Sequence, residues 1–446
     1  MSVRARRLCD WEREMTAPQP KVAGRPPQQR IVWRIGRQLG PGLITGAADD
    51  DPSGIGTYSQ AGAQLGFSIG WLMIMTYPLL AAIQQISARI GRTTGHGIAG
   101  NVRRHYPRWL LYSVVTLLFV ANTINIGADL RAMGDAARLL IGGPAALYIV
   151  LLGTICVLGI VLTTYTRYVA VLKWLTLSLL AYVAAMFAAN VPWGTAVVSM
   201  LVPHVQWNAG FFTTVLAIFG TTISPYLFFW QAAQEVEDQR AHRFERLTDA
   251  PEQAPAAFSR IRADTLMGMA LSNLIALAII FTTAATLHQA GITNIETSTQ
   301  AAEALRPIAG DFAFAVFALG VIGTGLLAVP VLAGSAAHAL GEACNVPVGL
   351  CRKPNTTVAF YLALGAPAVL GMVSTLTPLD PMRALYWSAV INGIVAVPVM
   401  TVMMLMTARP DVMGQFIICG WLRWLGWSAT GVMAACVAGM VVGWVG

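Results

Sequence analysis

Long apolar runs, each about as long as a bilayer-spanning helix, recur along almost the whole chain. A transmembrane helix needs about 20 mostly apolar residues, and charged or turn-rich breaks divide this sequence into eleven such runs. Only 11% of the 446 residues are charged, whereas soluble domains carry roughly 25%. The chain therefore has too few charged residues to cover the surface of a soluble domain. The sequence therefore predicts an all-α integral membrane protein with eleven spans, near 39–66, 67–88, 109–134, 145–165, 171–190, 210–234, 265–288, 312–340, 356–376, 383–407 and 425–445.

The basic residues are distributed as the positive-inside rule requires for this number of spans. With the N-terminus in the cytoplasm, 25 of the 29 Lys and Arg residues fall on the cytoplasmic side. We therefore expect a multi-pass protein of the inner membrane, surrounded by lipid, with its C-terminus on the outer side. Residues 1–38 are expected to be a disordered cytoplasmic tail. The net charge of +8 is then a topology signal, which removes the main argument for nucleic acid as a partner.

Two of the eleven spans are interrupted in their middle by polar and helix-breaking residues. The first reads GPGLITGAADDDPSGIGTYSQAGAQLG and the sixth reads FFTTVLAIFGTTISPYLFFWQAAQ. Because five spans separate the two breaks, the broken spans cross the bilayer in opposite directions, as in an inverted repeat. Paired breaks of this kind are the best sequence indicator of a transporter's binding site. We predict a ten-helix core over 39–407, built from repeats 39–190 and 210–407, and an eleventh helix within 408–446.

Three consecutive carboxylates, Asp49, Asp50 and Asp51, stand at the first break. A charge at that depth costs about 2.5–3.5 kcal/mol on insertion scales, so the three need water, a cation or protons. Asp51 before Pro52 is also a common helix start, and capping is compatible with cation binding. We expect Asp51 to belong to a cation site. Asp49 and Asp50 are expected beside it or along the pathway, either facing a water-filled vestibule or protonated.

The pattern GPG…DPxx…QAGAxLG in the first span resembles the Nramp family (natural resistance-associated macrophage proteins), whose members transport divalent metals. The resemblance continues around Gly220–Pro225 in the sixth span and in the layout of spans through about residue 407. It implies the inverted-repeat fold shared with LeuT-type transporters, with broken first and sixth helices. It also implies a metal site in which Asp51 and the backbone carbonyls of Ala48 and Thr221 are ligands.

Three residues of this chain depart from the family's usual motifs, which are Asp-Pro-Gly-Asn and Met-Pro-His. Gly54 replaces the metal-binding Asn, Ser224 replaces the metal-binding Met, and Tyr226 replaces the His. Loss of the soft thioether removes a bias toward transition metals, and Asp49 and Asp50 add hard oxygen donors. Mg²⁺ prefers oxygen ligands and gives up its waters reluctantly. We therefore predict a transporter of hard divalent cations, similar to the Nramp-related magnesium transporters, with Mg²⁺ as the first candidate cargo and Mn²⁺ as the second.

Other polar residues within the spans are candidates for the transport pathway. Asp129 falls near the family's acidic, proton-linked residues of the third span. Asn392 lies near a polar residue of the family's ion site, but a hydrogen bond that packs two helices is the role we favour for it. Gln231 could line the pathway or bond a neighbouring helix. Proton coupling is expected to be weak or absent, because a tyrosine such as Tyr226, with an unperturbed pKa near 10, carries protons poorly at neutral pH.

Two other functions fit the same fold. One is a proton-coupled Mn²⁺ or Fe²⁺ symporter of the usual Nramp type, and the other is a transporter of organic cations. An enzyme is not expected, because the chain has no HExxH motif and no His/Cys metal cluster. No cofactor is expected besides the transported ion, and the oligomeric state is not indicated.

Overall fold

The computed structural model describes residues 41–162, 179–189, 191–306, 310–349, 358–375 and 380–445. Every regular element within these ranges is a helix. The predicted tail 1–38 and much of the predicted fifth span lie outside the described residues. The helices of the first half are α3 (Pro41–Asp49), α4 (Pro52–Leu65), η1 (Gly66–Ile69), α5 (Gly70–Thr94), α6 (Ile98–His105), α7 (Arg108–Ile141), α8 (Ala145–Leu162) and α10 (Leu180–Ala188).

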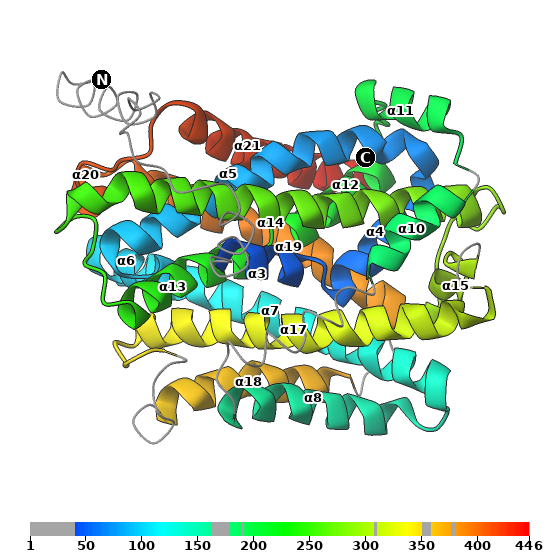
Figure 1. The fold of residues 1–446 in the computed structure, drawn as a ribbon, viewed down its shortest axis with the longest axis horizontal. Helices are drawn as coiled ribbons and strands as arrows, with labels where there is room; N and C mark the ends of the chain where they lie inside the picture. Colours follow the sequence, from blue (N-terminus) through cyan, green and yellow to red (C-terminus); the bar gives the residue numbers. More distant parts are fainter. Residues whose placement is uncertain are drawn as a thin grey trace, which may run out of the picture.

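The second half repeats the broken-helix start. Its helices are α11 (Trp193–Leu201), α12 (Ala209–Thr222), α13 (Pro225–Ala241), η3 (Pro251–Gln253), α14 (Ala254–Thr283), the π-helical turn η4 (Ala284–His288), α15 (Ser298–Glu303), η5 (Gly310–Phe312), α17 (Ala313–Ala343), α18 (Val358–Ser374), α19 (Pro381–Thr407), α20 (Pro410–Met413) and α21 (Gly420–Val445). The long helices α5, α14, α17 and α7 run lengthwise through the molecule, and the short α3 and α4 lie among them (Figure 1).

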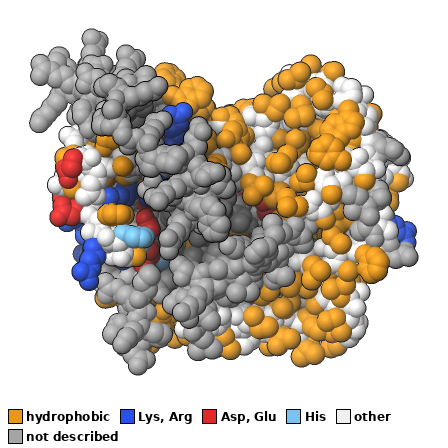
Figure 2. Space-filling model, viewed as in Figure 1, with side chains coloured by type: hydrophobic (Ala, Val, Ile, Leu, Met, Phe, Trp, Pro, Cys, Tyr) orange, Lys and Arg blue, Asp and Glu red, His pale blue; other side chains and the backbone are white. Residues whose placement is uncertain are grey.

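The described surface is that of a membrane protein. Seven described helices are long and apolar enough to cross a bilayer, and two shorter apolar helices accompany them. In the space-filling view the right-hand part of the face is largely hydrophobic, and most of the visible charged side chains lie toward the left end (Figure 2). The structure thus supports a multi-pass protein, while the total of eleven spans stays a prediction.

Both predicted helix breaks are present. The first helix stops at Asp49 and restarts at Pro52, and the sixth stops at Thr222 and restarts at Pro225. Each proline occupies the first helical position, where a missing backbone N–H costs nothing and the fixed φ suits the helix. The chain therefore changes from one helical segment to the next at the two places where the sequence contains an X-Pro step inside an apolar run.

Several helices extend well beyond the predicted apolar limits. α5 continues to Thr94, α7 continues to Ile141, and α14 begins at Ala254. The apolar pattern marks the part of a helix that faces lipid, whereas the helix itself ends where its backbone finds other partners. Arg92, in the extension of α5, illustrates this, because it donates to the backbone carbonyl of Glu245 and to the side chain of Gln253.

Two glycines let the broken helices pack directly on their neighbours. A Cβ on Gly46 of α3 would stand 2.4 Å from the carbonyl oxygen of Gly268 in α14, and one on Gly220 of α12 would stand 2.0 Å from the carbonyl oxygen of Ala389 in α19. Close approach of backbones through small residues is the usual way helices associate in lipid. These contacts place both breaks at fixed positions within the bundle.

We expect Gly220→Ala to destabilise the protein, because the added methyl group would meet backbone and not a flexible side chain. Overpacking of this kind typically costs about 1–3 kcal/mol. Thermal unfolding of the purified protein in detergent measures the effect. Gly431→Ala in α21 is the matched control, because no atom lies within 4 Å of its added Cβ. Equal melting temperatures for the two variants would contradict the close packing of α12 on α19.

Candidate metal centre

Asp51 uses its two carboxylate oxygens for different purposes. As N-cap of α4, it accepts a hydrogen bond from the Gly54 backbone N–H through Oδ1, at 2.6 Å. Oδ2 accepts from Asn125 Nδ2 at 3.1 Å and lies 3.2 Å from the Tyr226 hydroxyl. The residue is only 1% exposed. Capping therefore occupies one oxygen, and the other faces polar groups from α7 and α13.

The second break meets the first through Tyr226. Its hydroxyl donates to the Ala48 carbonyl at 3.0 Å, so it lies between the last turn of α3 and the Asp51 carboxylate. Ser224 is the N-cap residue of α13, but its hydroxyl donates to the Gly220 carbonyl at 2.5 Å and makes no capping bond. The buried hydroxyl of Thr221 has no hydrogen-bond partner within the described part of the chain.

Gly54 leaves polar groups of both breaks facing one point. A Cβ at this position would lie 3.3 Å from the Asp49 carbonyl oxygen, 3.3 Å from the Tyr58 ring and 3.4 Å from Thr221 Oγ1. A larger side chain here would press against these groups. The glycine therefore lets the unpartnered Thr221 hydroxyl approach the backbone of the first break. Thr221 and Asp49 are both buried there.

Asp49 and Asp50 share one donor. Ser272 of α14 donates to Asp49 Oδ2 at 2.5 Å and lies 3.3 Å from Asp50 Oδ1. A hydroxyl carries one hydrogen, so it serves only one carboxylate at a time, and Asp49 Oδ1 has no partner within the described ranges. Both carboxylates are buried, 0% and 2% exposed, so in this structure neither faces the open vestibule considered from the sequence.

Asp129 and Asn392 are joined to Asp51 through Asn125. Asn125 Nδ2 also donates to Asp129 Oδ2, at 3.2 Å, and Asn125 Oδ1 accepts from Asn392 Nδ2, at 2.9 Å. The Asn392 bond is thus a hydrogen bond between helices that ends on the Asp51 network. Gln231 lies apart from this group, accepting from Thr45 at 2.5 Å and thereby connecting α13 with α3.

Sequence reasoning missed Asn125 and Ser272. Asn125 carries a signal that could have found it: it stands four residues before Asp129, so the two side chains share a helix face in an apolar span. Ser272 carries no such signal, because a lone serine in a membrane helix usually bonds its own backbone. Only the packing of α14 against α3 brings it to the aspartates.

The groups that meet at this site could all bind a metal ion through an oxygen atom. They are carboxylates, an amide, hydroxyls and backbone carbonyls, a set that suits hard cations such as Mg²⁺, Ca²⁺ and Mn²⁺. Among the described residues, no ion pair involves the aspartates of the site, which are Asp49, Asp50, Asp51 and Asp129. No group of three His, Cys, Asp or Glu residues there has metal-site geometry. Buried carboxylates without a basic partner need protons or a cation.

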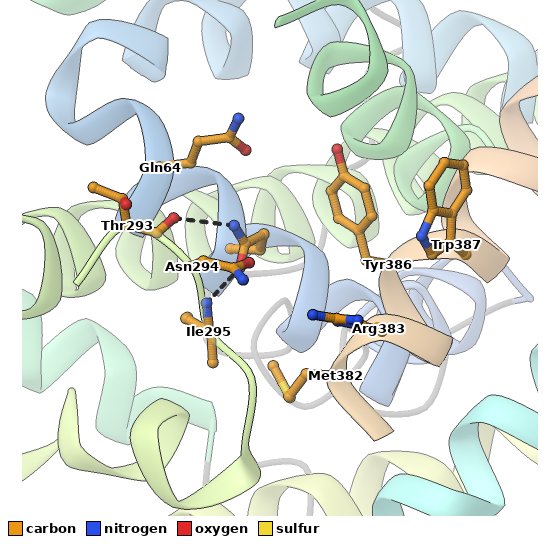
Figure 3. Close-up of a pocket in the computed structure, with 9 residues that line it drawn as sticks. Gln64, Thr293, Asn294, Ile295, Met382, Arg383, Tyr386 and Trp387 are labelled. Atoms are coloured by element: carbon orange, nitrogen blue, oxygen red, sulfur yellow. Dashed lines mark hydrogen bonds between the residues drawn. The ribbon is translucent and has the colours of Figure 1, made fainter. Parts of the chain in front are cut away.

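A cavity of about 470 Å³ lies farther along the helices that carry the site. It is lined by Gln60 and Gln64 of α4, Met382, Arg383, Tyr386 and Trp387 of α19, and Thr293, Asn294 and Ile295 of the connecting segment. Figure 3 shows Gln64 and Tyr386 on opposite walls. At about 1.5 Å per residue, Tyr386 stands roughly 9 Å along α19 from Asn392. The cavity and the site are therefore successive levels of the same helices.

Three side chains connect the walls of this cavity, and we call them the outer latch: Gln64, Thr214 and Tyr386. Thr214 of α12 donates to Gln64 Oε1 at 3.0 Å and lies 3.0 Å from the Tyr386 hydroxyl. Thr214 is fully buried. The latch thus links α4, α12 and α19, the helices that run from the cavity to the two breaks.

Comparison with known proteins agrees with this architecture. The chain is 24% identical over 416 residues to the divalent metal cation transporter MntH of Klebsiella pneumoniae, covering 91% of this chain and 94% of the relative. It is 27% identical over 407 residues to MntH of Deinococcus radiodurans, covering 88% of each.

Solved structures show the same fold. The manganese transporter of Eremococcus coleocola, in complex with an aromatic bis-isothiourea substituted compound, superposes with a TM-score of 0.69 at 17% identity, over 93% of this chain and 88% of that one. MhsT in complex with L-phenylalanine superposes with a TM-score of 0.58 at 11% identity, over 90% of this chain and 98% of that one. The predicted LeuT-like fold is confirmed.

The sequence model of one protein family, described as natural resistance-associated macrophage protein-like, matches residues 42–443. This match covers nearly all of the chain, including both helix breaks and every aspartate of the site. The expectation that the protein is a membrane transporter and not an enzyme is confirmed as well. The chain belongs to the Nramp family.

Proposed function

We propose that this protein carries divalent metal cations across the membrane by alternating access, binding each ion where the two helix breaks meet. The observation that carries the proposal is the Asp51 carboxylate, which is buried between the breaks and pairs with no basic residue among those described. Ala48 and Thr221 offer backbone carbonyls beside it, as the family resemblance implies, and Ser224 could add a hydroxyl oxygen by turning away from its own helix.

Mn²⁺ is the cargo we favour. The ligand chemistry alone placed Mg²⁺ first, but the curated relatives are divalent metal cation transporters named MntH, and a solved structure of the same fold is a manganese transporter. Mn²⁺ also accepts a site made of oxygen donors, so it satisfies both lines of argument. Mg²⁺ is the second candidate, supported by the loss of the thioether at Ser224.

The cavity and the outer latch form one end of the proposed transport route. With the cytoplasmic N-terminus predicted from the Lys and Arg distribution, the cavity opens toward the outer side of an inner membrane. Aqueous ions would reach the level of Gln60 and Gln64 first. Opening of the outer latch would then connect this level with the site, and its closure would isolate the ion before release into the cytoplasm.

We expect Asp51→Asn to reduce Mn²⁺ uptake into proteoliposomes at least about tenfold, which corresponds to 1.4 kcal/mol, because the anionic ligand is removed while the N-cap is kept. Asp135→Asn is the matched control, because Asp135 is a buried carboxylate of α7 that pairs with Arg138, away from the site. Wild-type uptake of Mg²⁺ and Cd²⁺ is measured in parallel. Preference for the soft Cd²⁺ over both hard ions would contradict a site of oxygen donors.

We expect proton movement to be weakly coupled to metal uptake. Tyr226 stands where the family has a histidine, and a phenol does not exchange protons readily at neutral pH. Internal pH of Mn²⁺-loaded proteoliposomes, followed with a trapped dye, should change by much less than one proton per ion. Tyr226→His should increase the coupling. Acidification of wild-type vesicles at the rate of metal uptake would identify a proton symporter.

We expect Thr214→Val to loosen the outer latch. The substitution keeps the shape and removes both hydrogen bonds, and an average hydrogen bond contributes about 1 kcal/mol, so the open population should rise by up to roughly thirtyfold. Hydrogen–deuterium exchange in peptides covering Pro52–Leu65 of α4 reports the opening. Thr213→Val is the matched control, because the Thr213 hydroxyl donates only to its own helix, at Ala209. Identical exchange in both variants would rule out a latch.

A further inference from the structure

We propose that Asn125 supplies an amide oxygen to the transported cation, and that Asn392 holds the Asn125 side chain in place for this role. The inference rests on the proposed function, because it concerns the same site. It identifies a ligand from α7 in a chain where Gly54 stands in place of the Asn side chain of the family's usual motif.

The Asn125 amide is fixed on both sides. Its NH₂ group reaches Asp51 Oδ2 and Asp129 Oδ2, at 3.1 and 3.2 Å. An ionised carboxylate only accepts, so the nitrogen of the amide faces the two oxygens. Its oxygen accepts from Asn392 Nδ2 at 2.9 Å, and both asparagines are buried. Asn125 thus stands between two carboxylates that attract a cation.

A cation bound by Asp51 would change which end of the Asn125 amide, the NH₂ group or the oxygen, is favoured to face the carboxylates. An NH₂ group between the two carboxylates would then point its positive hydrogens at the ion. Rotation of the amide by about half a turn about its terminal torsion, which is broad and roughly two-fold, would present the oxygen instead. Amide oxygens are ordinary ligands of hard divalent cations, so the rotated side chain would bind the ion.

Asn392 is suited to accept the rotated amide. Its Oδ1 is buried and has no hydrogen-bond partner among the described residues. When Asn125 rotates, its NH₂ group faces Asn392, and the same rotation of Asn392 would bring Oδ1 to it as an acceptor. The Asn125–Asn392 hydrogen bond is therefore kept with its direction reversed. The two asparagines thus have two hydrogen-bonded arrangements, one for the empty site and one for the site with a bound cation.

The test compares variants at Asn125 by Mn²⁺ titration calorimetry on purified protein. Asn125→Leu, which has a similar size and no oxygen, should weaken Mn²⁺ binding at least about tenfold, or 1.4 kcal/mol. Asn125→Asp, which has oxygen but no NH₂ group, should bind Mn²⁺ better than Asn125→Leu. If Asn125 only ties the two carboxylates together, its removal leaves both carboxylates free to bind Mn²⁺, so unchanged or tighter Mn²⁺ binding in Asn125→Leu would overturn the proposal.

Asn122→Leu is the matched control, because Asn122 lies one turn away on α7 and donates to Leu332 and Ser335 of α17. It should leave Mn²⁺ affinity within about twofold. The Mn²⁺-induced rise in melting temperature should shrink in Asn125→Leu and persist in Asn122→Leu.

The Asp51→Asn variant separates this proposal from the proposed function. Loss of binding in Asp51→Asn with wild-type binding in Asn125→Leu would reject only the role of Asn125. Absence of Mn²⁺ and Mg²⁺ binding in the wild type would reject the proposed function itself.

Discussion

An interruption of a helix inside a bilayer is the constraint on which the rest of this structure depends. Lipid offers no hydrogen bonds, so backbone groups freed at a break must find partners in the protein or line a polar cavity. Here Asp51 caps the restarted helix, Tyr226 donates to the Ala48 carbonyl, and Ser272 donates to the acidic pair. Polar side chains gather at the centre of the protein because the backbone groups at both breaks need hydrogen-bond partners there.

Close packing of helix backbones determines which side chains meet at this centre. Gly46 lets α3 lie against α14, which brings Ser272 to Asp49 and Asp50, and Gly220 lets α12 lie against α19. The resulting site draws on helices that are distant in the sequence, namely α3 and α4, α7, α12 and α13, α14, and α19. Its acidic groups have hydroxyl, amide and backbone partners but no basic ones among the described residues, so the negative charge is left for a cation or protons to neutralise.

The cavity, the outer latch and the site form three levels along α4, α12 and α19. The latch bonds are neutral hydrogen bonds of modest strength, which a small change in helix position can break and remake, as the proposed transport by alternating access requires. The site below them contains the buried charges. In the proposed function, a cation that binds one state better than the other would shift the balance between closed and open states.

The sequence by itself determined the class of protein, the two helix breaks and the family, and it made Asp51 the first candidate ligand, because apolar length, X-Pro steps and carboxylates at membrane depth are local features with few interpretations. It also pointed to hard-cation chemistry through Gly54 and Ser224. Only the tertiary structure decided that Asn125 joins Asp51 to Asp129 and Asn392, that the Ser272 hydroxyl lies between two aspartates, and that Gln231 lies apart. Those contacts depend on how helices cross and rotate, which is set by backbone packing at a few glycines and is not encoded in the spacing of residues along any one helix.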